Sequence, residues 1–420
     1  MSAKPESSDA PLDAADPFAV ALEPADDPKN LPTWRKWAIM FVISCGTLCA
    51  TSASSMAAFA EGGLIETFHV GKEVTILGVS LFVLGLGMGP LVVGPLSEIY
   101  GRNWVYRISY GLFFAFSWAV AFPPHIGVYI TFRFLTGFSS SAFLSVAGGT
   151  VSDIFDNHQI ATPMAIYTGS PFIGPVLGPL LSGFINQHAN WRWTFRVLII
   201  WTFVTWVLLI AIVPETFVPY ILKQKAAKLR KASGDDRFWA ALDRRTMSLP
   251  QLILRSCYVP VELLLVDRMA LLLDLWSALL LGILYLTFQA FPIIFGTVHG
   301  FAIQFVGMSF LGIGIGMVIG LLCQPLFNRR MRRLTLEHKG HPPPETRLFS
   351  AMIGGVMVPV SLFWLAFTTY RKLHWIAPII ASVPFGTGML FIYTGVFTFI
   401  FHRIGARLRA KSKFSSHEQF

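Results

Sequence analysis

Two charged side chains lie inside long apolar stretches, and they are the residues of this sequence best placed to do chemistry. Arg133 lies in Thr131-Phe-Arg-Phe-Leu-Thr-Gly-Phe, and Asp274 lies near the start of a later apolar stretch. An ionised side chain is costly to place in lipid, so such a residue is by default functional. Two structural alternatives stay open, since Arg133 could extend to the nearer membrane surface and Asp274 could mark a solvated helix end.

Aromatic and amide side chains form a second set with a recognisable spacing. Tyr285, Phe288 and Gln289 stand at i, i+3 and i+4, so they share one face of a helix. With Phe82 and Phe172 they would line a site for a flat, weakly polar compound, although packing or lipid contact is the alternative for each. Beyond the one aspartate already named, the apolar stretches hold no carboxylate. A buried di- or trication needs carboxylates to offset its lost hydration, which argues against a polyamine as substrate.

The composition indicates a membrane protein and excludes a single soluble globule. Of the 420 residues 54% are hydrophobic and 13% are charged, whereas a soluble domain has about 25% charged residues. An apolar segment of about 20 residues can cross a bilayer core of about 30 Å. We expect an all-α integral membrane protein whose ten spans lie roughly at 36–58, 75–96, 105–123, 127–150, 161–186, 193–213, 270–294, 301–325, 348–369 and 375–401.

Polar segments divide the chain and set its orientation. We expect residues 1–35 to be a disordered cytoplasmic tail, 215–268 a solvated, partly helical cytoplasmic linker, and 402–420 a basic cytoplasmic tail. Basic residues gather in these segments and in the loops on the same side, which places both termini in the cytoplasm. The net charge of +10 is therefore a topology signal and predicts no nucleic-acid partner.

A short charged motif joins the second and third expected spans. It reads Gly94-Pro-Leu-Ser-Glu-Ile-Tyr-Gly-Arg102. Gly94 and Gly101 allow close approach of the two helix ends, while Glu98 and Arg102 carry opposite charges. We expect a tight cytoplasmic turn here.

Glycine–proline pairs recur in the fifth expected span. Gly174-Pro175 and Gly178-Pro179 are four residues apart, so both pairs lie on nearly one helix face. Proline removes a backbone donor and glycine admits a close neighbour, which together predict a bent, grooved helix. A kink with no bearing on transport is the alternative.

These motifs together resemble the major facilitator superfamily of transporters, and in particular its fungal drug:proton antiporters for multidrug and polyamine efflux. Gly-x-Leu-Ser-Glu-x-x-Gly-Arg resembles the signature loop between helices 2 and 3 of that superfamily, and Gly-Pro-x-x-Gly-Pro resembles the antiporter motif of drug exporters. The resemblance covers about residues 25 to 395. Further segments that are similar to fungal members lie at 26–37, 190–196, 213–217, 271–292 and 344–348.

The resemblance implies a fold and a set of roles. It implies a six-helix bundle at 36–214 and a second bundle at 269–401, with substrate bound between them near the membrane midplane. It assigns proton coupling to Arg133 and Gly137, which match an Arg-Phe-x-x-Gly pattern on helix 4 of the superfamily. It also implies that Glu98 and Arg102 latch one half of the molecule against the other in the outward-facing state. Relatives often carry Glu where this chain has Gln289, and a neutral amide can neither titrate nor attract a cation.

We therefore expect a secondary transporter in the plasma membrane that exports hydrophobic drugs, toxins or a secondary metabolite in exchange for protons. Its partners are a small hydrophobic substrate, protons and the lipid bilayer, and the sequence leaves the oligomeric state undetermined. No cofactor and no enzymatic activity are expected, because the sequence shows no nucleotide-binding loop, metal cluster or nucleophile–base set. The four cysteines likewise have no paired or metal-binding spacing.

The chain departs from the resemblance after the tenth expected span. Two more spans should follow, but residues 402–420 are polar and basic. We therefore expect the second bundle to be incomplete, with four helices and without the last two. One account is a ten-span variant completed by self-association, and the other is a truncated, non-transporting or sensor-like relative. A polyamine exporter and an uptake symporter are further alternatives.

Overall fold

The computed structural model of the protein describes residues 18–156, 159–243, 249–337 and 343–417. Within these ranges the regular structure is helical except for one β-bridge, between Ala19 and Trp239. In chain order the elements are η1 (Pro28–Asn30), α1 (Thr33–Phe59), α2 (Glu61–Phe68), α3 (Lys72–Tyr100), α4 (Arg102–Ala121), α5 (Ile126–Ser140), α6 (Ala142–Ser145), α7 (Ala147–Ile154), α8 (Ala161–His188), α9 (Arg192–Ile212), α10 (Val218–Ser233), α11 (Leu249–Val266), α12 (Arg268–Phe291), the π-helical turn η2 (Pro292–Val298), α13 (Ile303–Ser309), α14 (Leu311–Glu337), η3 (Pro344–Leu348), α15 (Phe349–Phe367) and α16 (Ile376–His417).

Nine stretches of helix in the described residues are long and apolar enough to cross a membrane. They overlap nine of the ten expected ranges, so the all-helical membrane architecture is as predicted. The remaining range, 105–123, falls on α4, which is not among the nine. Arg102, Asn103 and Arg107 lie in the first two turns of α4 and lower its mean hydropathy.

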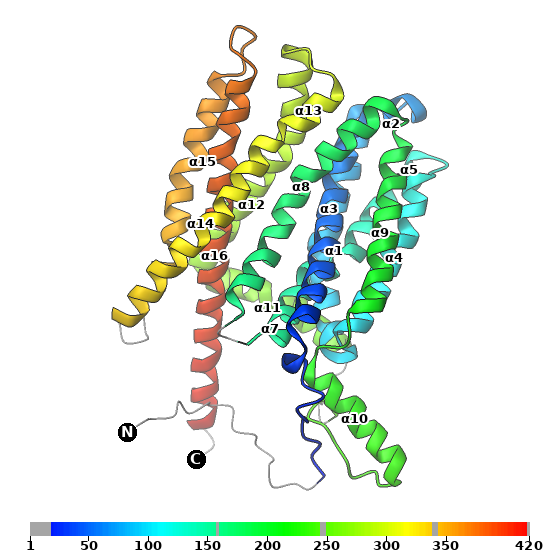
Figure 1. The fold of residues 1–420 in the computed structure, drawn as a ribbon, viewed down its shortest axis with the longest axis vertical. Helices are drawn as coiled ribbons and strands as arrows, with labels where there is room; N and C mark the ends of the chain where they lie inside the picture. The colour runs from blue at the N-terminus through cyan, green and yellow to red at the C-terminus, as the bar shows by residue number, and fades with distance from the viewer. Residues whose placement is uncertain (1–17, 157–158, 244–248, 338–342, 418–420) are drawn as a thin grey trace.

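The helices sort into two groups by their contacts (Figure 1). In the first group α1 packs against α8 and α9, α3 packs against α5, and α4 packs against α5 and α9. In the second group α16 packs against α12, α14 and α15. The groups meet chiefly where α8 contacts α13 and α14 and where α1 contacts α12. Helix α8 therefore holds the two groups together.

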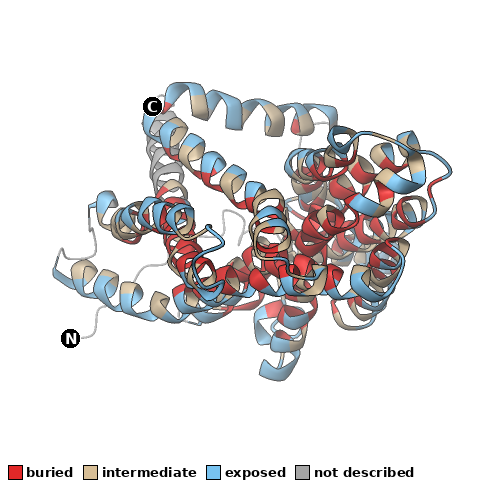
Figure 2. Ribbon diagram, turned by 90° about the horizontal axis from the view of Figure 1, so that it is seen from above, coloured by how far each residue is buried: buried red, intermediate tan, exposed pale blue. Residues whose placement is uncertain are grey.

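The outward faces of the helices are apolar, as a lipid environment requires. Viewed along the helices, buried residues lie between them and exposed residues face outward (Figure 2). The exposed residues include large apolar side chains such as Leu279 on α12 and Val356 and Phe363 on α15. A protein in water would bury such side chains, whereas a bilayer solvates them.

Glycines let α3 and α5 approach until their backbones touch. A β-carbon on Gly85 of α3 would collide with the carbonyl oxygen of Phe134 and lie 2.8 Å from the amide nitrogen of Phe138. A β-carbon on Gly137 of α5 would in turn collide with the carbonyl oxygen of Phe82. Small residues are used in this way because lipid supplies no hydrophobic force to drive helices together.

The glycines of the Gly-Pro motif face α1 of the same group. A β-carbon on Gly174 would collide with Thr51 Oγ1, and one on Gly178 would collide with Ser55 Oγ. Ser52 Oγ also donates a hydrogen bond of 3.0 Å to the carbonyl oxygen of Gly174. The motif thus fixes α8 against the Thr-Ser-Ala-Ser-Ser run of α1.

The opposite side of α8 makes similarly close contacts with the second group. A β-carbon on Gly307 of α13 would collide with the carbonyl oxygen of Pro179, and one on Gly183 would lie 3.2 Å from the α-carbon of Gly307. Further along, a β-carbon on Gly314 of α14 would lie 2.9 Å from Val176 Cγ1. Movement of one group against the other must therefore slide or open these contacts.

The described parts of the expected tails and linker contain regular structure and contacts, while residues 1–17, 244–248 and 418–420 lie outside the described residues. Within the expected tail, residues 18–32 lie along the linker, where Lys225 of α10 forms ion pairs with Glu23 at 2.7 Å and Asp26 at 2.8 Å. Helix α11 packs against α3 and α12 while exposing the apolar side chains of Leu254 and Leu265. Helix α16 continues to His417, beyond the expected end of the last span at 401.

Replacing Gly85 by alanine tests the α3–α5 contact. The added β-carbon meets backbone atoms that cannot rotate away, so we expect Gly85→Ala to destabilise the protein by about 1–3 kcal/mol. The matched control is Gly87→Ala on the same helix, where a β-carbon would meet no atom within 4 Å. Thermal unfolding of the detergent-solubilised protein measures both, and equal midpoints for the two variants would contradict the packing.

Candidate functional site

A cavity of about 390 Å³ lies between the two helix groups, at the end of the molecule where α2 joins α1 to α3. Its first-group side holds Phe59, Glu61 and Lys72, and its second-group side holds Phe288 and Gln289. The remaining lining residues are mostly small or apolar: Ala58, Gly62, Ile65, Pro292, Gly296, Phe301, Ile303 and Val306. The cavity is thus largely apolar with a few convergent polar groups, as is usual for small-molecule sites.

A hydrogen bond across the cavity joins the two groups directly. Gln289 Nε2 of α12 donates to Glu61 Oε1 of α2 at 2.6 Å. Glu61 is only 7% exposed, and α2 lies outside the nine candidate spans. Burial raises the pKa of Glu61 to about 7, although the Gln289 hydrogen bond and the charge of Lys72 both oppose this rise. The carboxyl group can therefore gain or lose a proton near neutral pH.

Glu61 was not among the residues predicted from the sequence. It follows the first expected span, which ends at 58, by three residues and so lies between the expected spans, whereas the sequence predicts an aromatic and amide lining. That expectation is wrong for this cavity, because Glu61 and Lys72 both line it. The available signal was a lone acidic residue at the edge of an apolar segment, whose boundary is uncertain by a few residues.

A second hydrogen bond between the groups lies close by. The hydroxyl groups of Ser54 on α1 and Tyr285 on α12 are 2.8 Å apart. Ser54 Oγ also lies 2.6 Å from the carbonyl oxygen of Thr51, to which it donates. Since a serine hydroxyl has one hydrogen, Tyr285 is the donor to Ser54. The helix face predicted to carry Tyr285, Phe288 and Gln289 thus points at the first group.

Further aromatic rings pack against Phe59 and Phe288, two of the rings that line the cavity. Phe310 contacts Phe59 of the first group with ring centroids 6.0 Å apart, and contacts Phe288 and Phe291 of its own group at 5.6 and 4.6 Å. These rings are buried. Phe59 and Phe288 provide apolar contact area for a bound compound, and the other two rings support them.

Arg133 is buried at the centre of the first group and does not extend to a membrane surface. Its side chain is 1% exposed. The guanidinium donates to the carbonyl oxygens of Gly78 at 2.8 Å and Ala53 at 3.0 Å, and its carbon lies 4.4 Å from the ring centre of Phe82. Arg133 also donates to the Ser54 carbonyl at 3.5 Å. It therefore holds the backbone of the residue that bonds Tyr285.

Three of the predicted residues lie away from this cavity. Phe82 packs under Arg133, and Phe172 stacks on Tyr393 of α16 with centroids 4.8 Å apart. Asp274 makes no hydrogen bond or ion pair with any other described residue. It precedes Gln289 by fifteen residues on the same helix, roughly 22 Å along the axis. The structure thus brings together Phe288, Gln289 and Tyr285, but not these three.

The motif at 94–102 is mostly helix, and its turn is confined to Gly101. Helix α3 continues through Tyr100, α4 begins at Arg102, and Gly101 between them has a φ of 85°. The expectation of a turn spanning the whole motif is therefore wrong. Only glycine adopts this conformation without strain, and a side chain there would also collide with Glu215. Gly94, by contrast, has no atom within 4 Å of the position of a β-carbon.

Arg102 joins helices of the first group to one another. Its Nε donates to Asp153 Oδ2 on α7 at 3.0 Å, and its guanidinium lies 4.9 Å from the ring centre of Phe217. It also donates to Ser97 Oγ at 3.2 Å. All these partners belong to the first group or to the segment directly after α9. Glu98 is exposed on the last turns of α3.

Glu215 caps the same corner with its carboxylate. The backbone amides of Arg102, Thr216 and Phe217 donate to its Oε1 at 2.9–3.0 Å, and that of Asn103 donates to its Oε2 at 3.1 Å. The amides of Arg102 and Asn103 are otherwise unsatisfied because they open α4, where a negative charge is also favoured. Pro-Glu-Thr after α9 therefore fixes the start of α4.

No group of His, Cys, Asp and Glu in the described part of the chain could hold a metal ion. The chemistry that this site supports is accordingly proton exchange at Glu61 and binding of a small compound against aromatic rings.

Comparison with known proteins gives consistent results. The sequence profile of the Major Facilitator Superfamily matches residues 43–413. The chain is 46% identical over 323 residues to a protein named efflux pump atB from Aspergillus terreus, covering 75% of this chain and 67% of that protein. It is 40% identical over 383 residues to the probable drug/proton antiporter YHK8 of Saccharomyces cerevisiae, covering 90% of this chain and 74% of that protein.

Among solved structures, the inward-open, partially occluded xylose transporter XylE of E. coli superposes with a TM-score of 0.60. The alignment covers 89% of this chain and 85% of the transporter at 15% identity, so it shows a shared fold alone.

The carboxylate of Glu215 can be tested by an isosteric change. In Glu215→Gln one acceptor oxygen becomes an amino group that faces backbone amides, so we expect a loss of about 1–3 kcal/mol in stability. The control is Glu66→Gln on α2, because Glu66 is exposed. Thermal unfolding in detergent measures both variants. A midpoint for Glu215→Gln equal to that of the control would show that the cap does not stabilise the corner.

Proposed function

This chain belongs to the Major Facilitator Superfamily, and we propose that it exports hydrophobic drugs, toxins or a secondary metabolite in exchange for protons. The observation that carries the proposal is the hydrogen bond from Gln289 to Glu61, which joins the two helix groups across the candidate site. A titratable group whose environment depends on the closure of the two groups can couple proton binding to alternating access. The relatives named as an efflux pump and a drug/proton antiporter support the direction of transport.

The proton step follows from the burial of Glu61. When the groups close around it, burial raises the pKa of the carboxyl group to about 7. When they open, water returns and the pKa falls towards the ordinary glutamate value of about 4.3. Closure therefore takes up a proton, and lower pH favours the closed arrangement by linkage. Acid on the α2 side would thus drive the transporter from open to closed on that side, as an antiporter requires.

The lining of the cavity favours a neutral or weakly polar substrate. Phe59, Phe288 and Phe301 offer aromatic surface. Glu61 supplies one carboxylate, but Lys72 in the same lining supplies an opposite charge. A di- or tricationic polyamine would find no net negative charge among the described lining residues. A polyamine exporter remains the alternative, supported only by the sequence resemblance.

The remaining predicted residues keep supporting roles in this proposal. Arg133 fixes the Ser54 backbone that meets Tyr285, so it would transmit the state of one group to the other. Gly183 of α8 and Gly307 of α13 provide a small-residue contact along which the groups can move. Asp274 and Phe172 would act at another stage of the cycle.

We place the protein in the plasma membrane with both termini in the cytoplasm. In this orientation the α2 end faces outward, and the contacts Glu61–Gln289 and His188–Gln304 lie at that end. The conformation described here would then be closed at its outer, α2 end. The latch role of Glu98 and Arg102 would belong to the opposite, outward-facing state.

Replacing Glu61 by glutamine should separate transport from proton coupling. Glutamine keeps the shape of the side chain but cannot titrate. In proteoliposomes we therefore expect the rate of efflux driven by an imposed pH gradient to be at least tenfold lower in Glu61→Gln than in the unaltered protein. Equilibrium exchange of a neutral hydrophobic dye should continue, because it needs no proton. Glu66→Gln, on the exposed face of the same helix, should behave like the unaltered protein.

Other outcomes of the Glu61→Gln experiment would favour one of the alternatives. Gradient-driven efflux that survives in Glu61→Gln assigns coupling to another group. Efflux of spermidine in preference to the dye favours the polyamine alternative. Absence of both efflux and exchange in the unaltered, folded protein favours the non-transporting alternative.

The closure of the α2 end should depend on pH through Glu61. Spin labels at His188→Cys and Gln304→Cys, with the four native cysteines replaced by alanine, report the distance between α8 and α13. We expect short distances to gain population at pH 6 relative to pH 8, because the closed arrangement loses stability as the pH rises through the pKa of about 7. The added Glu61→Gln change should remove this dependence and leave the short distances favoured. A pH response that persists in that variant would rule out Glu61 as the switch.

A further inference from the structure

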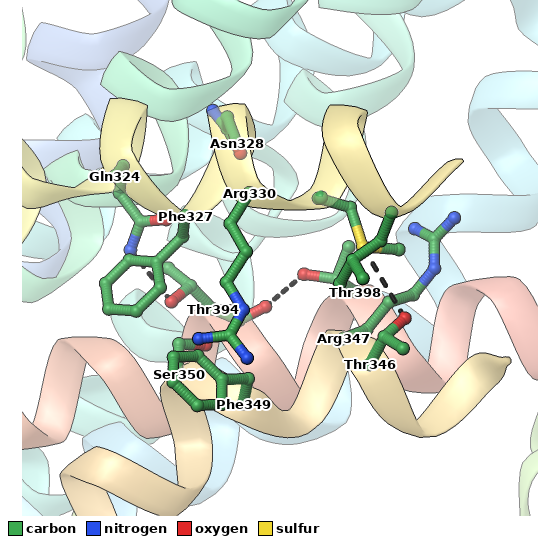
Figure 3. Close-up of a pocket in the computed structure, with 12 residues that line it drawn as sticks. Gln324, Phe327, Asn328, Arg330, Thr346, Arg347, Phe349, Ser350, Thr394 and Thr398 are labelled. Atoms are coloured by element: carbon green, nitrogen blue, oxygen red, sulfur yellow. Dashed lines mark hydrogen bonds between the residues drawn. The ribbon is translucent and has the colours of Figure 1, made fainter. Parts of the chain in front are cut away.

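A second, smaller cavity lies in the other helix group, at the end away from α2. Its volume is about 80 Å³, and it is enclosed by the last turns of α14, by η3, and by α15 and α16. Figure 3 shows Arg330 extending from α14 towards Phe349, with Arg347 at the opposite end of the cavity beside Thr346. The other walls are Gln324, Phe327, Asn328, Met331, Leu334, Ser350, Thr394 and Thr398.

The two arginines of this cavity have no acidic partner among the described residues. The guanidinium of Arg330 lies 3.6 Å from the ring centre of Phe349, and it forms no ion pair with a described carboxylate. Neither described glutamate of this region lines the cavity, and Glu337 pairs with Arg333 at 3.2 Å. Among the polar side chains of the lining, Thr346, Thr394 and Thr398 donate their hydroxyl hydrogens to backbone carbonyl oxygens, whereas the side-chain amide of Asn328 can donate to a ligand. The cavity is therefore positive and equipped to bind an anion.

The corresponding region of the first group, around Arg102, has carboxylates beside its arginine. Arg102 follows the loop between the second and third spans of its group, as Arg347 follows the loop between α14 and α15. Arg102 is neutralised by Asp153, and its amide is capped by Glu215. No described carboxylate occupies the equivalent place beside Arg347. The region around Arg347 in the second group thus has the arginine but lacks the carboxylates that accompany Arg102 in the first group.

We propose that this cavity binds the phosphate group of an anionic phospholipid. Arg330 and Arg347 would contact the phosphate oxygens, and the side-chain amide of Asn328 would complete the site. Basic pockets between membrane helices are suited to anionic headgroups. The same two helices offer apolar surface for the acyl chains, because Leu322 and Leu326 of α14 and Met352 of α15 are each more than 60% exposed. A free phosphate ion would use the same arginines but would gain nothing from this apolar surface.

The test is lipid binding to the full chain, purified in a neutral detergent and measured by native mass spectrometry. Dioleoyl phosphatidic acid is titrated against dioleoyl phosphatidylcholine, which has the same chains but no net charge. We expect the phosphatidic acid to bind preferentially. Arg330→Gln and Arg347→Gln should each weaken its binding about fivefold, the effect of about one removed charge near a membrane surface.

The control is Arg332→Gln on the same helix, because Arg332 is exposed and does not line the cavity. An equal loss of binding in this control would overturn the proposal, since the attraction would then be a general one to the basic helix end. Unchanged binding in Arg330→Gln would also overturn the proposal. Because the Arg330 side chain is exposed, we expect this variant to fold normally. If inorganic phosphate displaces the lipid at equal concentration, the site serves free phosphate and the assignment to a lipid is wrong.

Discussion

The structure depends on α8 packing against both helix groups at once. In a bilayer, helices gain little from hiding apolar surface, so their association rests on close contact and on hydrogen bonds. The glycines at 174 and 178 bring α8 against α1, while the backbone at Pro179 and Gly183 meets Gly307 of α13. A side chain at any of these contacts would push the helices apart. The same small-residue surfaces that hold the groups together also lack interlocking side chains, which allows one group to move over the other.

Against this background of apolar contacts, the few polar groups have separable tasks. Arg102, Asp153 and Glu215 join helices within the first group, so they stiffen it as a unit. Glu61–Gln289 and Ser54–Tyr285 join one group to the other. The bonds within a group can persist while the molecule changes state, whereas the bonds between groups must break when the α2 end opens. Because Glu61 is titratable and takes part in a bond between the groups, the opening of the α2 end would respond to pH.

Much of the architecture was predictable because it follows from local properties of the chain. Apolar length defined the spans, and the resemblance of Gly-x-Leu-Ser-Glu-x-x-Gly-Arg and Gly-Pro-x-x-Gly-Pro indicated the family. The i, i+3, i+4 spacing put Tyr285, Phe288 and Gln289 on one helix face, and the hydrogen bonds of Tyr285 and Gln289 show that this face meets the first group. The charged turn was predicted too long, because Glu98 and Ser97 can remain helical when a single glycine makes the whole turn at 101.

The sequence by itself determined the class of protein, the approximate spans and which residues are unusual in lipid, since these depend on composition and on neighbours along the chain. Only the tertiary structure decided which of those residues meet. Glu61 and Gln289 are separated by more than two hundred residues, and no periodicity relates a residue at the edge of one span to a residue deep in another. The environment of Glu61, and therefore its pKa, is set by that contact and by burial between the groups. A property that arises from two distant segments enclosing one carboxyl group exists only once the chain has folded.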